Sequence, residues 1–155
     1  MKSAIQMANR LHEVIFDGTW IANTNFKDQL DNCTWEMATK SYCGLNSIAL
    51  LTQHIHYYIA GINNVFENGT LDIKDQYSFD FPPITSQSDW EMVLTTFWND
   101  AKKMIHYIEN LTDNELNATF VEPKYGNYSR NIDAMIEHSY YHLGQISLIN
   151  KLLKN

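Results

Sequence analysis

The sequence has 155 residues, 45% of them hydrophobic and 19% charged, a composition typical of a globular protein rather than a disordered chain. Its formal net charge is −7, from 11 basic and 18 acidic residues with no basic stripe, so we expect binding neither to nucleic acid nor to an anionic membrane surface. No apolar run approaches the roughly 20 residues that a membrane span needs.

The length fits one domain covering residues 1–155. Polar side chains interrupt the N-terminal segment, which therefore lacks the continuous apolar core of a signal peptide, and we expect a cytoplasmic protein. Cys33 and Cys43 lie ten residues apart and form no CxxC pair, so in a reducing compartment they are expected to be ordinary buried or half-buried thiols.

The first half of the chain predicts two long helices. The first covers about residues 3–16, up to the turn pair Asp17-Gly18. Its apolar face is formed by Ile5, Ala8, Leu11 and Ile15. A looser region, about 20–40, follows and includes a short helical turn around residues 26–30. The second helix covers about residues 45–66, where isoleucines recur every seven residues, and Asn68-Gly69 ends it.

The stretch DIKDQYSFDFPPIT is predicted to be non-helical, because Pro82-Pro83 cannot lie inside a helix. A third helix opens with the capping-box pattern of Ser88 to Glu91 and ends near residue 110. A second capping-box match, Thr112 to Glu115, precedes a short hairpin or extended loop at 117–128. The last helix covers 129–153. Four amphipathic helices predict an all-α four-helix bundle with a long crossover loop after the second helix.

Two histidines in the last predicted helix indicate a candidate metal site. With about 100° per residue, His142 lies within the apolar face and His138 lies about 40° away, toward its edge. Two imidazoles at positions i and i+4 can bind one metal ion from a single helix, as in HExxH helices. The spacing alone is weak evidence, because histidines on an apolar face are more often hydrogen-bonded core residues than metal ligands.

A three-ligand site needs a donor from another helix, and the second helix offers His54 and His56. These lie about 200° apart on a helix, so only one can face the core, and the helical wheel favours His54. His56 is then expected at the solvated surface. His12 also falls on an apolar face and stays open as a ligand, whereas His106 is expected to be exposed.

Three short motifs occur together in this chain. They are His138-Ser139-Tyr140-Tyr141-His142-Leu143-Gly144-Gln145, the run Asn46-Ser47-Ile48 that leads to His54 and Tyr58, and Gly18-Thr19-Trp20 after the first helix. In their order and spacing the chain resembles the DinB/YfiT-like superfamily of small metal-binding four-helix bundles. The resemblance covers essentially the whole length.

The resemblance implies a divalent metal ion, zinc or nickel, held by His54, His138 and His142, and a homodimer. It also implies a small-molecule substrate, since characterised members use low-molecular-weight thiols. Three neutral imidazoles leave positions open on a metal, and such a site can make a bound water or thiol nucleophilic. We therefore expect a metal-dependent enzyme, with thiol S-transfer as the leading reaction. The alternative is a non-catalytic metal- or small-ligand-binding bundle.

Tyr58 and Gln145 lie one helical step from the candidate ligands. They are candidates for orienting an imidazole or a substrate, and ordinary packing is the alternative. The neighbouring Tyr57, Tyr140 and Tyr141 are expected in the core or in a dimer interface, because aromatic residues at helical spacing usually pack.

Overall fold

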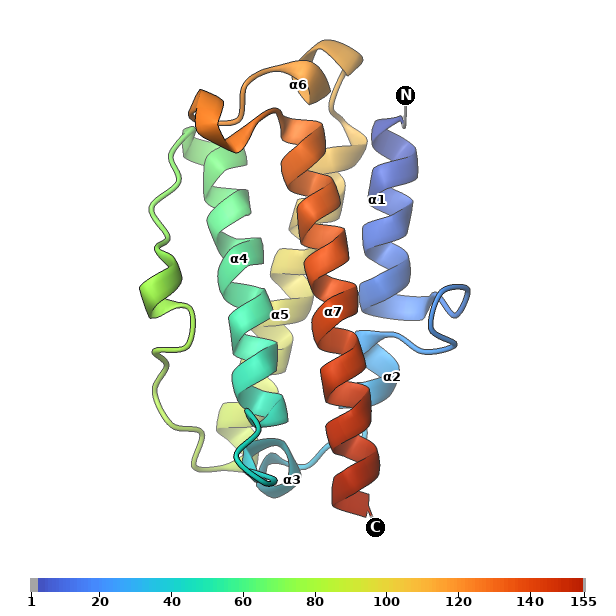
Figure 1. Cartoon of the computed structure of the whole chain (residues 1–155), viewed down its shortest axis with the longest axis vertical. Helices are drawn as coiled ribbons and strands as arrows, with labels where there is room; N and C mark the ends of the chain where they lie inside the picture. The colour runs from blue at the N-terminus through green and yellow to red at the C-terminus, as the bar shows by residue number, and fades with distance from the viewer. Residues whose placement is uncertain (1–2, 155) are drawn as a thin grey trace.

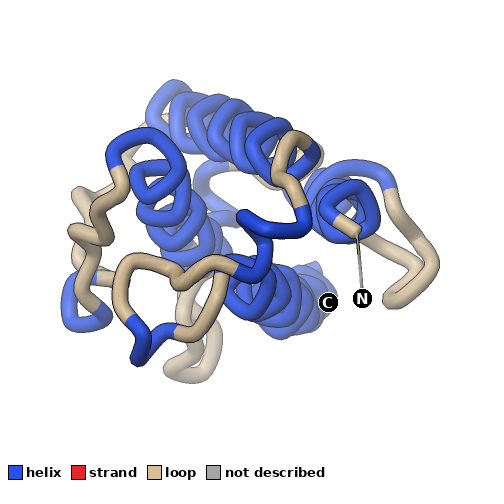
Figure 2. The backbone as a smooth tube through the Cα atoms, turned by 90° about the horizontal axis from the view of Figure 1, so that it is seen from above, coloured by secondary structure: helices blue, strands red, loops and turns tan. Residues whose placement is uncertain are grey.

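The computed structural model describes residues 3–154 and confirms an all-helical chain, with no strand in this range (Figure 2). Two isolated β-bridges are the extended pairings among these residues. The α-helices are α1 (Ala4–His12), α2 (Phe26–Leu30), α3 (Trp35–Thr39), α4 (Ile48–Asn68), α5 (Gln87–Glu109), α6 (Asp113–Asn117) and α7 (Tyr128–Lys154). Short turns of other helix types are η1 (Glu13–Asp17), η2 (Asp75–Tyr77) and η3 (Pro123–Tyr125).

Helices α1, α4, α5 and α7 pack side by side as a bundle (Figures 1 and 2). In Figure 1, α1 and α7 run downward, whereas α4 and α5 both run upward. Because α4 and α5 are parallel neighbours, residues 69–86 must return from the upper end of α4 to its lower end. This segment, here called the α4–α5 connection, follows the outer side of α4 and carries η2.

Helix α1 begins with a complete capping box, in which Ser3 accepts from the backbone N–H of Gln6 and the Gln6 side chain accepts from the N–H of Ser3. The π-helical turn η1 then ends at Asp17, before Gly18. The predicted apolar face is wrong at one position, because Ile5 is 61% exposed and Met7 is fully buried. The buried stripe is centred on Ala4, Met7 and Leu11, and Ile5 lies about 100° from the first of these.

Helix α4 begins after Ser47, whose hydroxyl accepts from the N–H of Leu50, and ends at Gly69 with φ 73°. The left-handed conformation at Gly69 needs no Cβ and lets its N–H reach the carbonyl of Val65. The helix buries the isoleucines at positions 48, 55 and 62 that predicted it. Its first turn starts about three residues later than predicted.

Helix α5 begins two residues earlier than the predicted capping box, which is therefore wrong. Ser86, rather than Ser88, accepts from the N–H of Asp89, and Asp89 reaches back to Thr85. Four residues further on, the fully buried Trp90 donates its indole N–H to the carbonyl of Cys33 at 2.8 Å. This bond joins α5 to the chain before α3, a helix that the sequence did not predict.

The second capping box is confirmed, with Thr112 and Glu115 satisfying each other's backbone donors at the start of α6. A β-bridge between Thr119 and Asn127 closes the following loop as a short hairpin. Helix α7 then runs to Lys154. Across residues 3–154, none of the helices has the length and apolar character to cross a membrane.

Candidate metal centre

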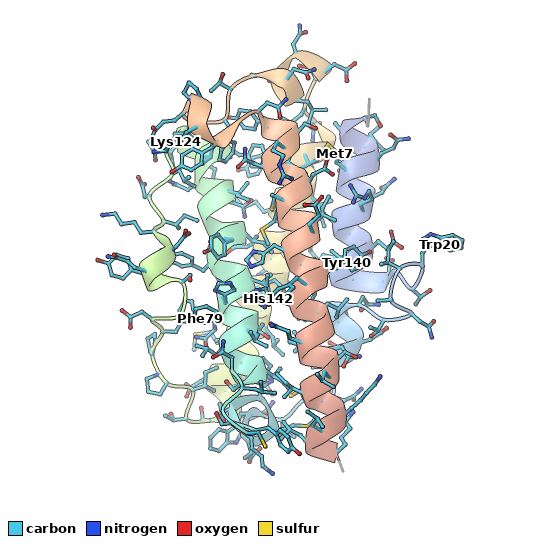
Figure 3. The ribbon with its side chains drawn as sticks, in the orientation of Figure 1. Met7, Trp20, Phe79, Lys124, Tyr140 and His142 are labelled. Carbon is cyan, nitrogen blue, oxygen red and sulfur yellow. The ribbon has the colours of Figure 1, made fainter. Side chains whose placement is uncertain are left out.

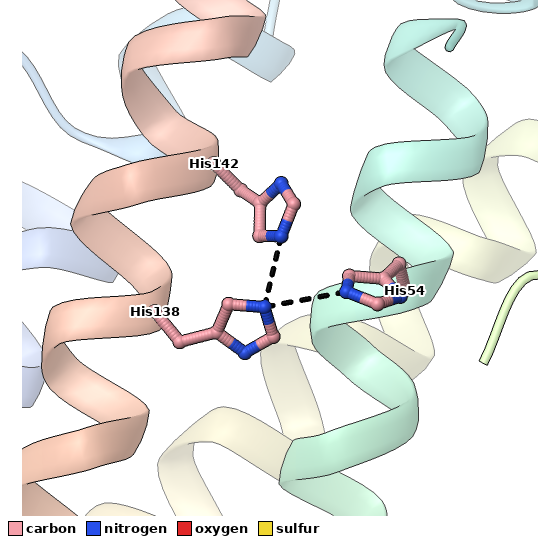
Figure 4. Close-up of side chains that lie close together, drawn as sticks. All are labelled: His54, His138 and His142. Carbon is pink, nitrogen blue, oxygen red and sulfur yellow. Dashed lines mark hydrogen bonds between the residues drawn. The ribbon is translucent and has the colours of Figure 1, made fainter. Parts of the chain in front are cut away.

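Helices α4 and α7 bring His54, His138 and His142 together (Figure 4). His54 and His142 are each 5% exposed, and His138 is half-buried. The Nε2 atom of His138 lies 3.2 Å from Nε2 of His54 and 2.8 Å from Nε2 of His142. All candidate ligand atoms of the three rings lie within 4.8 Å of one another. Three nitrogen donors therefore converge on one point in the interior.

The outer nitrogens of two rings are tied to oxygen acceptors. Nδ1 of His54 lies 2.9 Å from the carbonyl oxygen of Ser78, and Nδ1 of His142 lies 2.7 Å from Oε1 of Gln145. A carbonyl oxygen only accepts, so each Nδ1 donates and carries the ring proton. In the neutral rings, Nε2 then presents its lone pair toward the centre. This arrangement is typical of histidine ligands in metal sites.

Burial keeps the three imidazoles neutral. Burial, together with the smaller effects of the neighbouring His142 and His54, lowers the pKa of His138 to about 4. Burial also lowers the pKa values of His54 and His142 below the ordinary value. Neutral imidazole is the form that binds a metal ion, so the rings are ready to bind at neutral pH.

The donor set fits a divalent ion. In the neutral triad at most one proton lies between three converging nitrogens, so lone pairs face each other without a compensating charge. Tetrahedral zinc at its usual Zn–N distance would separate two nitrogen ligands by about 3.3 Å, which compares with 3.2 Å between His138 and His54 and 2.8 Å between His138 and His142. Three protein ligands are also the number found in catalytic zinc sites that keep a position for water or substrate.

Aromatic rings pack against the triad. The ring of Phe79 stacks on that of His54, with centroids 4.0 Å apart and an interplanar angle of 8°. Tyr58 contacts the rings of His54 and His138 edge-on, each at 5.1 Å. Figure 3 shows Phe79 on the connection side of α4, at about the height of His142. These contacts hold the imidazoles in place and exclude water from one side of the site.

A cavity of about 490 Å³ opens beside the triad, and His138 lines it directly. We call it the His138 cavity. Tyr58, Lys74 and Asp75 form its polar wall, and the Tyr58 hydroxyl donates to Oδ1 of Asp75 at 3.0 Å. Its remaining lining is largely apolar: Ile62, Leu71, Ile73, Phe120, Tyr125, Asn131, Ala134 and Met135. A ligand in this space would contact both charged groups and one of the candidate metal ligands.

The α4–α5 connection supplies two of these site groups, the Ser78 carbonyl and the Phe79 ring. It is held to α4 by Tyr57, whose hydroxyl accepts from the N–H of Lys74 at 2.9 Å and donates to its carbonyl at 3.1 Å. Further along, Gly61 lets Ile73 pack directly against the helix backbone. These contacts position the segment that orients His54.

The sequence did not predict Ser78 or Phe79 as site residues. They lie in an irregular segment, where no periodicity assigns a side chain to a face. Tyr58 and Gln145, which were predicted, lie at the site: Tyr58 contacts two of the rings and Gln145 accepts from His142.

The other histidines lie away from the triad. His56 was predicted at the solvated surface, but it is half-buried against α5, where its Nε2 lies 2.7 Å from Oδ2 of Asp100. His12 contacts Asp17 near the surface, and His106 is exposed as predicted. His54 is thus the histidine of α4 that joins the pair on α7.

Comparisons with protein-family models, with curated proteins and with solved structures find no match to this chain. The resemblance to the DinB/YfiT-like superfamily accordingly stays a prediction, as do the implied homodimer and the cytoplasmic location. The histidine cluster is the observation on which a function can be based.

Proposed function

We propose that the chain is a metal-dependent enzyme in which His54, His138 and His142 bind a divalent ion, zinc or nickel, with thiol S-transfer as the leading reaction. The convergence of three neutral imidazoles beside a cavity, two of them oriented by hydrogen bonds at Nδ1, supports this proposal most directly. We include in the proposal the assignment as a DinB-like bundle with a crossover connection and the homodimer, both of which rest on the resemblance.

The bound ion would lower the pKa of a water or thiol placed on an open position and so make it nucleophilic near neutral pH. The protein groups have separate tasks. Ser78 and Gln145 keep two imidazoles in the ligating tautomer. Tyr58 and Asp75 present a hydrogen-bonded pair to the His138 cavity, where they can orient the polar end of a substrate. Phe79 shields His54 from water.

The test is a transfer assay with metal-loaded protein, a low-molecular-weight thiol such as cysteine, and a chromogenic aryl chloride. In a productive turnover the S–H proton passes to solvent, an S–C bond forms, and chloride leaves with the electrons of the broken C–Cl bond. We expect activity to disappear in His54→Ala, His138→Ala and His142→Ala. His56→Ala, on the same helix as His54 but bonded to Asp100, is the matched control and should stay active.

The result also separates the two functions that the sequence allows. Metal binding without turnover, with all coordination positions filled by protein side chains, would support the non-catalytic metal-binding bundle. Absence of metal binding under any condition would contradict both of these and would leave only the small-ligand-binding form of the alternative.

A further inference from the structure

The triad lies between two cavities, both of which are lined by residues of α4 and α7. The second cavity, about 370 Å³ in volume, lies toward the C-terminal end of α7 and is here called the Gln145 cavity. Its lining is Gly44, Leu45, Asn46, Leu51, Gln145, Leu148 and Ile149. Along α4, Leu51 lines this cavity and Tyr58 lines the His138 cavity, with His54 between them. Along α7, Gln145 lines this cavity and His138 lines the His138 cavity, and the two residues are about 10 Å apart along the helix axis.

The two cavities differ in charge. Lys74 and Asp75 line the His138 cavity, whereas no charged side chain lines the Gln145 cavity. Four of its seven lining residues are leucine or isoleucine. A dry cavity of about 150 Å³ with similar lining is large enough to bind benzene. The Gln145 cavity is open to solvent on the side of Leu45 and Leu148, which are 43% and 54% exposed, and it suits an uncharged, largely apolar molecule, because a charged molecule would find no partner of opposite charge in its lining.

Gln145 connects this cavity to the candidate metal ligands. Its side chain lines the cavity, and its Oε1 accepts the Nδ1–H of His142 at 2.7 Å. A molecule in the cavity would therefore contact the group that orients one imidazole.

We infer that the Gln145 cavity binds a small uncharged apolar molecule, and that this molecule is the electrophilic acceptor in the transfer. The second part of the inference rests on the proposed function. The acceptor carries a carbon with a leaving group, such as a halide. The nucleophile in the His138 cavity loses its proton to solvent, forms a bond to that carbon, and the leaving group departs with the electrons of its own bond. Two cavities of different polarity on either side of the triad keep the reactants apart until they meet there.

The test uses zinc-loaded protein and three probes that share one ring: benzyl alcohol, which is uncharged, and benzoate and benzylamine, which are charged. Leu148 lines the cavity and is 54% exposed, so Leu148→Glu introduces a charge there without opening the core. Ile5→Glu, at an exposed site on α1, is the matched control. Binding is measured by ligand-observed NMR, and metal content is measured on the same samples.

We expect benzyl alcohol to bind about tenfold or more tightly than either charged probe, and to lose about tenfold in Leu148→Glu but not in Ile5→Glu. Equal binding of the three probes, or an unchanged affinity in Leu148→Glu, would overturn the inference. If either of these results came from protein that holds its metal, the proposed function would stand and only the inference about the Gln145 cavity would fall. Selective binding of benzyl alcohol to a chain that holds no metal would instead leave the binding site in place and overturn its role as an acceptor site.

Discussion

Replacing Gln145 by alanine should weaken metal binding by about tenfold. The substitution removes the acceptor that lies 2.7 Å from Nδ1 of His142 and leaves all three ligating rings in place. Loss of such a supporting hydrogen bond typically costs about 10- to 100-fold in metal affinity, or roughly 1.4–2.7 kcal/mol. The lower end of this range applies here, because Gln145 is half-buried at the edge of a cavity, where water can take over the Nδ1–H.

The assay is competition for zinc between the protein and a chromogenic chelator, with affinities compared at one pH. Gln53→Ala is the control, since Gln53 is a half-buried glutamine of α4 that lines different cavities. Gln145→Glu provides the opposite perturbation, because a carboxylate accepts the same proton more strongly and should raise the affinity. Equal affinities for wild type and Gln145→Ala, or an equal loss in Gln53→Ala, would refute the assignment of Gln145 as the group that orients His142.

Three further predictions concern the scaffold and its thiols. In Gly61→Ala the new Cβ would lie 2.6–2.9 Å from three side-chain atoms of Ile73. We therefore expect the free energy of unfolding in urea to fall by about 1 kcal/mol, although alanine has the better helix propensity. Adding Ile73→Ala to this variant should restore part of the loss. Burial raises the pKa of Cys33 to about 11, so at pH 8 only about 0.1% of this thiol is thiolate. The exposed Cys43 should therefore react rapidly with a thiol reagent, whereas Cys33 should react only on unfolding. Equal reaction rates of the two cysteines would contradict this prediction. Trp90→Phe should lower the free energy of unfolding by about 1–3 kcal/mol, because the carbonyl of Cys33 loses its buried donor, and an unchanged urea midpoint would show that this bond contributes little.

Periodicity predicted the parts of the molecule that are regular. The isoleucines of α4 recur every seven residues, and they are buried as this spacing predicts. The same logic placed His54 on the core side of α4 and His142 on the core side of α7. Because four residues make about one helical turn, His138 had to lie next to His142. The three histidines that meet in the structure were therefore identifiable from side-chain direction together with the resemblance.

Irregular segments could not be predicted in the same way. Ser78 acts through its backbone carbonyl, which every residue has, and no side-chain pattern distinguishes it. The start of α5 was misplaced because Ser86 and Ser88 both suit a helix N-cap, and only the bond to Asp89 selects Ser86. His56 was expected in solvent because its partner, Asp100, lies 44 residues away on another helix, and no local pattern reveals that contact.

The most direct test of the central claim is the metal content of untagged protein, measured by elemental analysis for wild type, His142→Ala and His56→Ala. We expect about one zinc or nickel ion per chain in wild type and in His56→Ala, and loss of that ion in His142→Ala. Wild-type protein that holds no divalent ion even after reconstitution, or His142→Ala protein that retains it fully, would contradict the claim that the three histidines form a metal site.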